Sequence, residues 1–333
     1  MNRLLAGLLG ALLATNQSVA ASNRVQQTTG ASVAVTDSKD PVEQEYRKLL
    51  EDDDAAQADA DKWIKDNQAF KAKGAGLSEA TLSLKIEQRF ESLRKRYEDF
   101  LMRHAKHTRA RLAYGSFLSD TGKESEARDQ WEKARELDPH NPAAWNNLAN
   151  FYGHRGPVTN AFAYYEKAIQ LNPQEPVYCQ NFATTVFLFR SDAMDFYRLS
   201  EQQVFDKALG LYRQALKLDT NNFVLATDLA QTYYGIKPDR RSEALEAWRY
   251  ALKVAGDEIE REGVYVHLAR WEMSGGQLAE AQAHLHAITN SLYAEIKGRL
   301  TRNLAAKQAS PSGAGTNATP TAPAPGPAAT EAK

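Results

Sequence analysis

The amino-acid sequence predicts an all-α protein in which helix pairs stack into a solenoid behind an N-terminal helical extension. The main observation is a repeat, because similar residues recur every 34 positions, as at Asp138-Pro139 and Asn172-Pro173. Apolar residues also recur every three or four positions from Leu82 to Phe100, which is the period of one helix face. With 333 residues the chain is too long for one small core, whereas a solenoid grows by adding repeats.

Residues 1–20 have the three regions of a secretory signal peptide. Arg3 supplies a positive start, residues 4–14 are apolar, and the small residues Ser18 and Ala20 define a cleavage point after Ala20. The apolar run is shorter than the roughly 20 residues that a bilayer span needs. We therefore expect an exported protein, periplasmic or secreted, that does not span a membrane once the signal is removed.

Residues 21–39 are small and polar, which predicts a flexible linker. Asp40 and Pro41 then form the signature of a helix start, and Ser78 can cap a second helix after a break at Gly74. Residues 40–107 are thus expected to form N-terminal helices, the last part of which resembles half a repeat.

The charged residues of this extension are typical of solvated helix faces. The acidic run at 52–54 lacks the spacing and the glycine of a calcium loop, so a solvated helix face is favoured. The second helix carries a basic band that includes Arg89, Arg96 and Arg103. This band could meet an acidic surface, but we expect a solvated helix face next to the acidic neighbouring helix. A net charge of −1 gives no reason to expect nucleic-acid binding.

Five repeats are expected over residues 108–289, beginning near Thr108, Pro142, Pro176, Phe223 and Glu262. In the second copy the residues on pattern are Trp145, Leu148, Ala149, Tyr152, Gly156, Ala161, Tyr165, Ala168 and Pro173. This pattern resembles the tetratricopeptide repeat. The resemblance implies a right-handed α-solenoid of tetratricopeptide helix pairs with a capping helix over residues 290–307. The tail over 308–333 is rich in Pro and Ala and is expected to be disordered.

The repeat positions have physical roles that explain their residue types. Small residues such as Ala149 and Ala161 let the two helices of a repeat approach closely. An aromatic residue such as Tyr165 fills the space beside the next repeat, and Pro173 stops the second helix.

The third repeat departs from the period, because residues 190–202 are extra between its two helices. We expect them to lengthen the first helix and to form a protruding loop before Ser200, where a capping box with Gln203 restarts the helix. Phe196 and Tyr197 would then be exposed loop contacts. The alternative is that both aromatic residues fold back over the edge of the repeat.

The residues that could carry chemistry do not form a recognisable site. Cys179 is the only cysteine, so an internal disulfide and a Cys-rich zinc site are excluded. The pairs His104/His107 and His284/His286 lack an evident third ligand. No phosphate-binding glycine loop or catalytic motif is present. We therefore expect a non-enzymatic protein without metal or cofactor.

The first helix of each tetratricopeptide repeat lines a concave groove, so the resemblance identifies candidate partner-binding residues. They are Asn146, Asn147, Asn150, Gln180, Asn181, Thr184, Thr227, Asp228, Gln231 and Arg270, and Arg109, Ser116 and His267 occupy similar positions. The row Asn147, Asn181 and Asp228 resembles the asparagine ladder of O-linked N-acetylglucosamine transferases, in which side-chain amides hold a peptide backbone. Asparagine is also frequent at this repeat position in general.

The sequence therefore predicts an exported adaptor or scaffold that binds a protein or peptide segment in its groove. The alternative is an accessory subunit of an envelope polysaccharide-export or secretion machine that docks through repeat edges and the 190–202 insert. Substitutions at Asn150 and Gln231 would impair binding in the first case, and changes in the insert would do so in the second.

Overall fold

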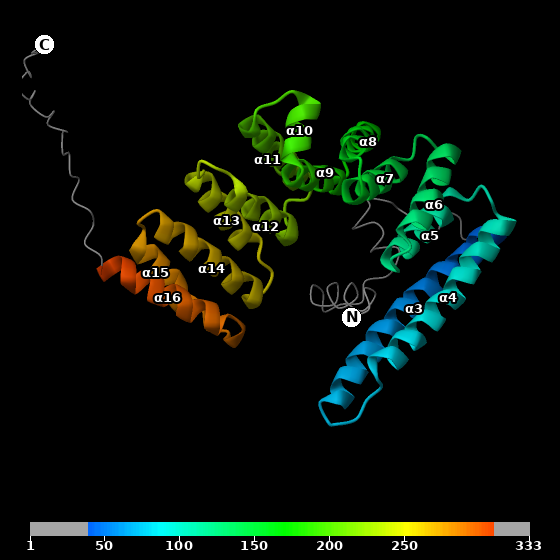
Figure 1. The fold of residues 1–333 in the computed structure, drawn as a ribbon, viewed down its shortest axis with the longest axis horizontal. Helices are drawn as coiled ribbons and strands as arrows, with labels where there is room; N and C mark the ends of the chain where they lie inside the picture. The colour runs from blue at the N-terminus through cyan, green and yellow to red at the C-terminus, as the bar shows by residue number, and fades with distance from the viewer. Residues whose placement is uncertain (1–38, 310–333) are drawn as a thin grey trace, which may run out of the picture. The chain divides into compact units, whose positions relative to one another are not determined.

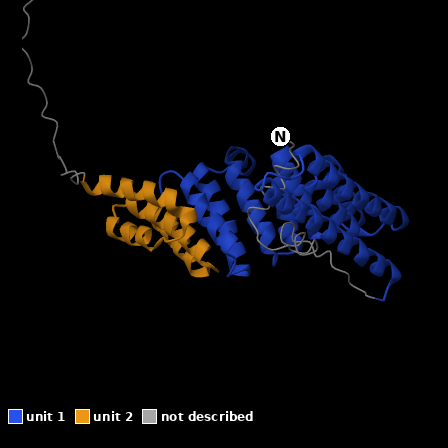
Figure 2. Ribbon diagram, turned by 90° about the horizontal axis from the view of Figure 1, so that it is seen from below, with its two compact units in different colours: residues 1–239 blue, residues 240–333 orange. Residues whose placement is uncertain are grey.

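The computed structural model describes residues 39–309, which form 14 α-helices and two short 3-10 turns. The all-α class and the helix-pair solenoid are confirmed. The predicted signal peptide and the tail beyond residue 309 lie outside the described residues, as does the linker up to residue 38. The chain divides into two compact units, residues 1–239 and 240–333 (Figure 2), and each is described separately.

Unit 1 contains the N-terminal extension and the first repeats (Figure 1). Its helices are α3 (Pro41–Lys71), α4 (Glu79–Arg103), α5 (Thr108–Asp120), α6 (Glu124–Leu137), α7 (Pro142–Arg155), α8 (Val158–Leu171), α9 (Pro176–Leu188), α10 (Arg190–Tyr197), α11 (Glu201–Leu218) and α12 (Phe223–Thr232). Unit 2 contains α13 (Arg241–Val254), α14 (Glu258–Ser274), α15 (Leu278–Ala287) and α16 (Ala294–Ala309).

Helices α3 and α4 lie side by side as a long hairpin (Figure 1). Asp40 caps α3 by accepting a hydrogen bond from the Val42 amide at 2.8 Å, and Ser78 caps α4, as the sequence predicted. In the acidic middle of α3, the carboxylates of Asp52 and Asp59 pair with Arg89 of α4. Arg96 and Arg103 also pair with carboxylates of α3 while they remain partly exposed, so the basic band lies next to the acidic helix as expected.

The repeats of unit 1 pair α5 with α6, α7 with α8 and α9 with α11. Close approach depends on small residues, since Ala127, Ala161 and Ala208 are fully buried in the three second helices. Gly115 shows how tight the contact is, because a Cβ built there would lie 2.3 Å from Trp131 Nε1. Any larger residue at this position would require Trp131 to shift.

The insert in the third repeat differs from the expectation. Helix α9 ends at Leu188 without being lengthened, and α10 is a separate helix that packs against α8 and α11. Tyr197 Oη donates a hydrogen bond to Glu166 Oε1 at 2.8 Å, and the Phe196 ring lies 5.5 Å from Phe162. The protruding loop is thus wrong and the fold-back alternative is confirmed, because these rings bury apolar surface against α8. The capping box at Ser200 is also confirmed.

Unit 2 has its own core of α14, α15 and α16 side chains. Leu300 and Leu304 of α16 are buried against α14 and α15. Glu262 of α14 fixes the turn before α16 by accepting hydrogen bonds from the backbone amides of Thr289 and Asn290. Within residues 39–309 no helix combines the length and the apolar composition that a membrane span requires.

Candidate functional site

The predicted groove residues of unit 1 lie on the first helices α7, α9 and α12, but Asn146 and Asn147 are fully buried. In the amide orientation that satisfies its neighbours, Asn147 accepts from Trp131 Nε1 at 3.2 Å and donates to the Ala143 carbonyl at 3.3 Å. The resemblance to the asparagine ladder implied an amide open to a peptide, and for Asn147 this is wrong because its side chain is buried. Its amide joins the second helix of one repeat to the first helix of the next.

Two further pairs connect consecutive first helices. Asn181 Nδ2 of α9 donates to Asn146 Oδ1 of α7 at 3.3 Å. Gln180 Nε2, also of α9, donates to Asp228 Oδ2 of α12 at 2.8 Å. Burial raises the pKa of the Asp228 carboxyl, and the hydrogen bond from Gln180 partly offsets this effect. The row of polar residues thus links the helices of unit 1 to one another.

A second hydrogen bond recurs one repeat apart. Tyr165 Oη donates to Asn150 Oδ1 at 2.7 Å, and the hydroxyls of Thr184 and Tyr212 lie 2.7 Å apart. In each case a groove residue on the first helix forms a hydrogen bond with the aromatic residue on the second helix of the same repeat. The Asn150 oxygen is used in this way, while its amide nitrogen has no hydrogen bond within the described part of the chain.

The remaining predicted residues differ in their surroundings. Thr227 bonds back to the Val224 carbonyl at 2.8 Å, and Gln231 is exposed on α12. Arg270 lies half-buried on α14 in unit 2. Burial, and to a smaller extent the positive charge of Arg270, lowers the pKa of His267 to about 4. The His267 ring stacks on the ring of Trp248, with 4.0 Å between the ring centroids.

A pocket of about 300 Å³ opens between α5, α6, α7 and α9, and we call it the groove pocket. It is lined by Ser116, Ser119, Asp120, Glu124, Trp131, Asn147, Asn150, Phe151, His154 and Asn181. The sequence reasoning identified Ser116, Asn147, Asn150 and Asn181 but missed the other lining residues. Ser119 and Asp120 could have been predicted from their spacing, because they follow Ser116 by three and four positions and therefore lie on the same helix face.

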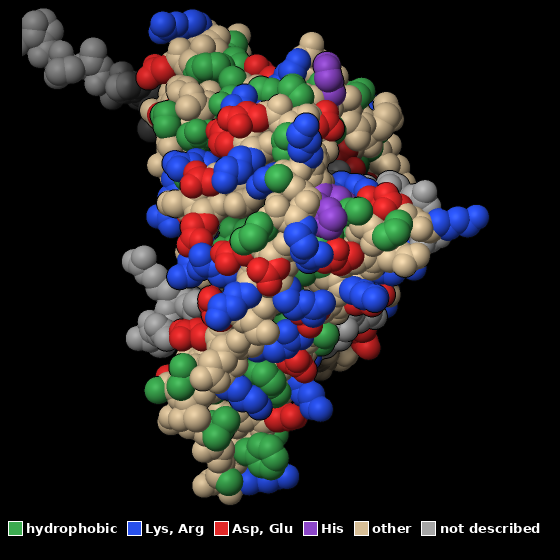
Figure 3. Space-filling model, turned by 90° about the vertical axis from the view of Figure 1, so that its right-hand side faces the viewer, with side chains coloured by type: hydrophobic (Ala, Val, Ile, Leu, Met, Phe, Trp, Pro, Cys, Tyr) green, Lys and Arg blue, Asp and Glu red, His purple; other side chains and the backbone are tan. Residues whose placement is uncertain are grey.

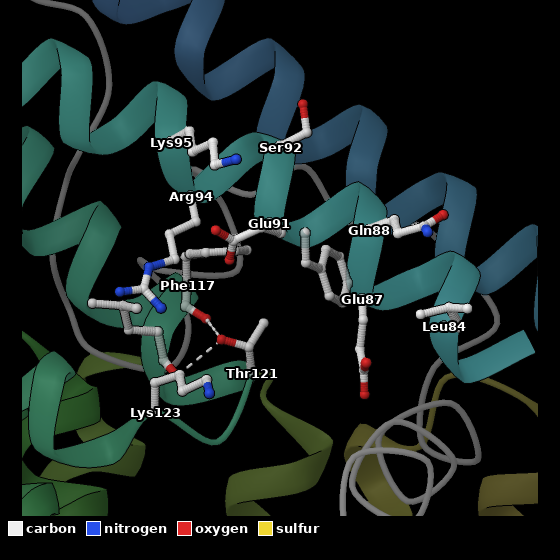
Figure 4. A pocket seen from close by; sticks show the side chains of 12 residues that line it. Leu84, Glu87, Gln88, Glu91, Ser92, Arg94, Lys95, Phe117, Thr121 and Lys123 are labelled. Carbon is white, nitrogen blue, oxygen red and sulfur yellow. Dashed lines mark hydrogen bonds between the residues drawn. The ribbon is translucent and has the colours of Figure 1, made fainter. Parts of the chain in front are cut away.

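A larger pocket of about 650 Å³ lies between α4 and α5 (Figure 4). Leu84, Phe90 and Phe117 supply apolar lining, and Glu87, Glu91, Arg94, Lys95 and Lys123 carry charges of both signs. The Thr121 hydroxyl at its edge is satisfied by the carbonyls of Phe117 and Leu118. No sequence pattern indicated this pocket, because it arises where the long α4 extends past the short α5.

Charged residues elsewhere pair with one another. On the face drawn in Figure 3, Lys and Arg side chains are interspersed with Asp and Glu. The two histidine pairs have structural contacts, since His107 Nδ1 caps α5 through the Ala110 amide and His284 Nδ1 lies 2.8 Å from Glu272. Among residues 39–309 there is no group of three or more His, Cys, Asp or Glu side chains that could hold a metal ion.

Comparison with known proteins agrees with the repeats. The sequence profile of the tetratricopeptide repeat matches residues 108–151 and 142–175. No curated protein sequence matches the chain. Among solved structures, the type IV pilus biogenesis factor PilW is similar in fold, with a TM-score of 0.50 and 14% identity over 67% of this chain and 96% of PilW.

Two other solved structures are similar at a lower level. PilF of Pseudomonas aeruginosa has a TM-score of 0.49 and 14% identity over 75% of this chain and 99% of its own. YrrB, described as a tetratricopeptide-repeat protein with an unusual peptide-binding site, has a TM-score of 0.46 and 14% identity over 62% of this chain and 97% of its own. The matched profiles therefore identify tetratricopeptide repeats over residues 108–175, and the described helices share the helix-pair solenoid fold of this repeat.

Proposed function

We propose that the protein is an exported, non-enzymatic adaptor or scaffold, and that the first-helix face of unit 1 binds a segment of a partner protein. The observation that carries this proposal is the groove pocket, a hollow of about 300 Å³ to which four helices contribute side chains. Its polar groups can pair with a peptide backbone, since an amide such as that of Asn150 offers a donor that the fold does not use.

The affinity expected of this face is modest. Asn146 and Asn147 are fully buried, so they hold the helices together and cannot meet a ligand directly. The groups left for binding are Asn150, Gln231 and the more exposed side chains that line the groove pocket. Each neutral hydrogen bond contributes about 0.5–1.5 kcal/mol net, which gives specificity through several weak contacts.

Photo-crosslinking in cells that express the protein tests the site. A benzophenone amino acid replaces Ser119 in the groove pocket and, in matched variants, Ser92 in the α4–α5 pocket or Phe196 on α10. All three positions lie on helices and at least partly meet solvent. We expect a discrete crosslinked partner from position 119 only. Crosslinks from the other positions without one from 119 would contradict the proposal.

The second candidate function is docking through the edge formed by α10. Its supporting observation is Phe196, which packs on Phe162 yet remains 41% exposed. An accessory subunit of an envelope polysaccharide-export or secretion machine would use such an edge. A crosslink at Phe196 alone would favour this alternative over groove binding.

Export is the part of the proposal that rests on residues 1–20 alone. Their charged start, apolar stretch and small residues before Ala21 are typical of a cleaved signal. N-terminal sequencing of the protein from its native cells should start at Ala21 or Ser22. An intact Met1 on cytoplasmic protein would rule out export by this signal.

A further inference from the structure

The turn between α3 and α4 presents two large apolar side chains to solvent. Phe70 is 56% exposed in the last turn of α3, and Leu77 is 43% exposed directly before Ser78, the cap of α4. Between these two residues the sequence contains only Lys, Ala and Gly. We call residues 70–77 the hairpin tip.

Hydrogen bonds hold the backbone of the tip. The buried Asn67 donates from Nδ2 to the Leu77 carbonyl at 3.2 Å, and its Oδ1 accepts from the Leu77 amide at 2.7 Å. The Phe70 carbonyl accepts from the amides of Lys73 and Ala75. Because the backbone beside both apolar residues is fixed in this way, the fold itself directs their side chains to solvent.

The tip extends past the first repeat. Helix α4 has 25 residues and α5 has 13, and residues 104–107 join the two helices at the end opposite the tip. At 1.5 Å per residue, α4 is longer than α5 by about 18 Å. Figure 1 shows the turn between α3 and α4 at the end of the hairpin away from α5.

The charge of the tip is positive. Residues 67–78 contain Lys71 and Lys73 and no Asp or Glu. Neither lysine has a carboxylate partner in the part of the chain that the structure describes. The flanking helical turns carry one carboxylate each, Asp66 and Glu79. An anionic surface could therefore approach the tip without displacing an ion pair.

Lysine stems lie along apolar surface at this end of the hairpin. A Cβ built on Gly76 would lie 2.9 Å from Lys71 Cγ, so the Lys71 stem packs against the turn. Trp63 precedes Phe70 by seven residues and shares its face of α3, and the Lys85 ammonium lies 3.9 Å from the Trp63 ring centroid. Side chains of this kind place their charged heads in a polar layer above apolar groups.

We propose that the hairpin tip docks on the surface of an anionic lipid bilayer. Phe70 and Leu77 enter the boundary between headgroups and acyl chains, and the ammonium groups of Lys71 and Lys73 meet lipid phosphates. A second copy of the tip fits less well, because it would bring lysines against lysines. This inference is independent of the groove that the proposed function assigns to a partner segment.

Flotation with lipid vesicles tests the inference. One set of vesicles is phosphatidylcholine, and the other contains about one third phosphatidylglycerol as the anionic lipid. Residues 1–20 are removed from every protein because the apolar run at 4–14 would itself bind lipid, and all described helices are kept. We expect at least about tenfold stronger binding to the anionic vesicles, and high salt should reduce the difference.

One matched pair of variants tests the apolar contact. Phe70→Gln with Leu77→Gln should weaken binding to anionic vesicles at least about tenfold. Ile259→Gln with Leu292→Gln makes the same change at exposed positions of unit 2 and should retain binding. Circular dichroism of both variants verifies that they are folded.

A second matched pair tests the charges. Lys71→Gln with Lys73→Gln should weaken binding at least about fivefold, since each lysine near an anionic surface contributes a factor of this order. Lys133→Gln with Lys217→Gln changes the net charge equally at exposed positions of α6 and α11 and should retain binding.

A fluorescent label reports on the tip itself. An environment-sensitive dye is attached at Ala75→Cys or, as the control, at the exposed position Ala163→Cys on α8. Cys179 is buried and does not compete for the dye. Emission from position 75 should shift to the blue with anionic vesicles, and emission from position 163 should not.

Three outcomes would overturn the inference. The first is full-strength vesicle binding by the Phe70/Leu77 variant, or an unshifted emission from position 75. The second is absence of vesicle binding together with a discrete protein crosslink from a benzophenone at position 75, which would assign the tip to a protein partner. The third is self-association that the Phe70/Leu77 variant abolishes. The crosslink from Ser119 tests the groove separately, so failure here leaves the proposed function standing.

Discussion

Ser116 of α5 and Asn147 of α7 both line the groove pocket and are both buried, but their hydrogen bonding differs. Asn147 meets Trp131 and Ala143, whereas Ser116 Oγ has no partner within the described residues. The repeat register could place both residues on the groove side of their helices. It could not predict their burial, because burial depends on how closely Trp131 and the following repeat approach.

Ser116→Ala should stabilise the free protein because it removes a buried hydroxyl that lacks a partner. The matched control is Ser119→Ala, which makes the same change in helix propensity at a half-exposed position of α5. We expect Ser116→Ala to raise the free energy of unfolding by about 1 kcal/mol more than the control. Urea denaturation of both variants measures the difference, and a net loss of stability at Ser116 would contradict the unsatisfied hydroxyl.

His267 should make stability depend on pH. Its pKa of about 4 in the folded protein lies below the ordinary value of 6.5, so the unfolded chain takes up a proton more readily. The stability that the neutral ring contributes is complete above pH 6.5 and is lost as the pH falls from 6.5 towards 4. His267→Phe keeps a ring against Trp248 and should flatten this part of the melting-temperature profile of the full chain. Parallel profiles for the two proteins would contradict the depressed pKa.

At the scale of elements, α10 shows what the repeat period can and cannot predict. The period located the extra residues at 190–202, and the capping box at Ser200 identified the start of α11. The period contains no information on packing partners, and the contacts with Phe162, Glu166 and Lys207 come from α8 and α11. A short segment that mixes polar and apolar residues, such as 190–197, suits an exposed loop and a covering helix equally well.

Tyr197→Ala should destabilise the protein, because it removes the ring that packs near Phe162 and the hydroxyl that bonds Glu166. A loss of about 1–3 kcal/mol in the free energy of unfolding is expected. Asp195→Asn is the control, since this exposed residue of α10 should change stability by no more than about 0.5 kcal/mol. A neutral Tyr197→Ala would show that α10 is not held against the repeats in solution.

At the scale of the whole molecule, the tetratricopeptide fold was predictable because its signals are local and repeated. Small residues such as Ala161 and aromatic residues such as Tyr165 recur at fixed positions, and each copy supports the others. The binding surface was predictable only in part. The repeat register identified the face that carries Asn150 and Asn181, but the groove pocket also needs Asp120 and Glu124, which flank the turn between α5 and α6.

The central claim is that the first-helix face of unit 1 binds the partner, and the most direct measurement is the affinity for the partner segment recovered by crosslinking. Ser119→Tyr fills the groove pocket, and Ser92→Tyr fills the α4–α5 pocket as a matched control. Isothermal titration calorimetry should show at least about tenfold weaker binding for Ser119→Tyr, a loss of about 1.4 kcal/mol, and unchanged binding for Ser92→Tyr. Full affinity in a folded Ser119→Tyr variant would contradict the claim.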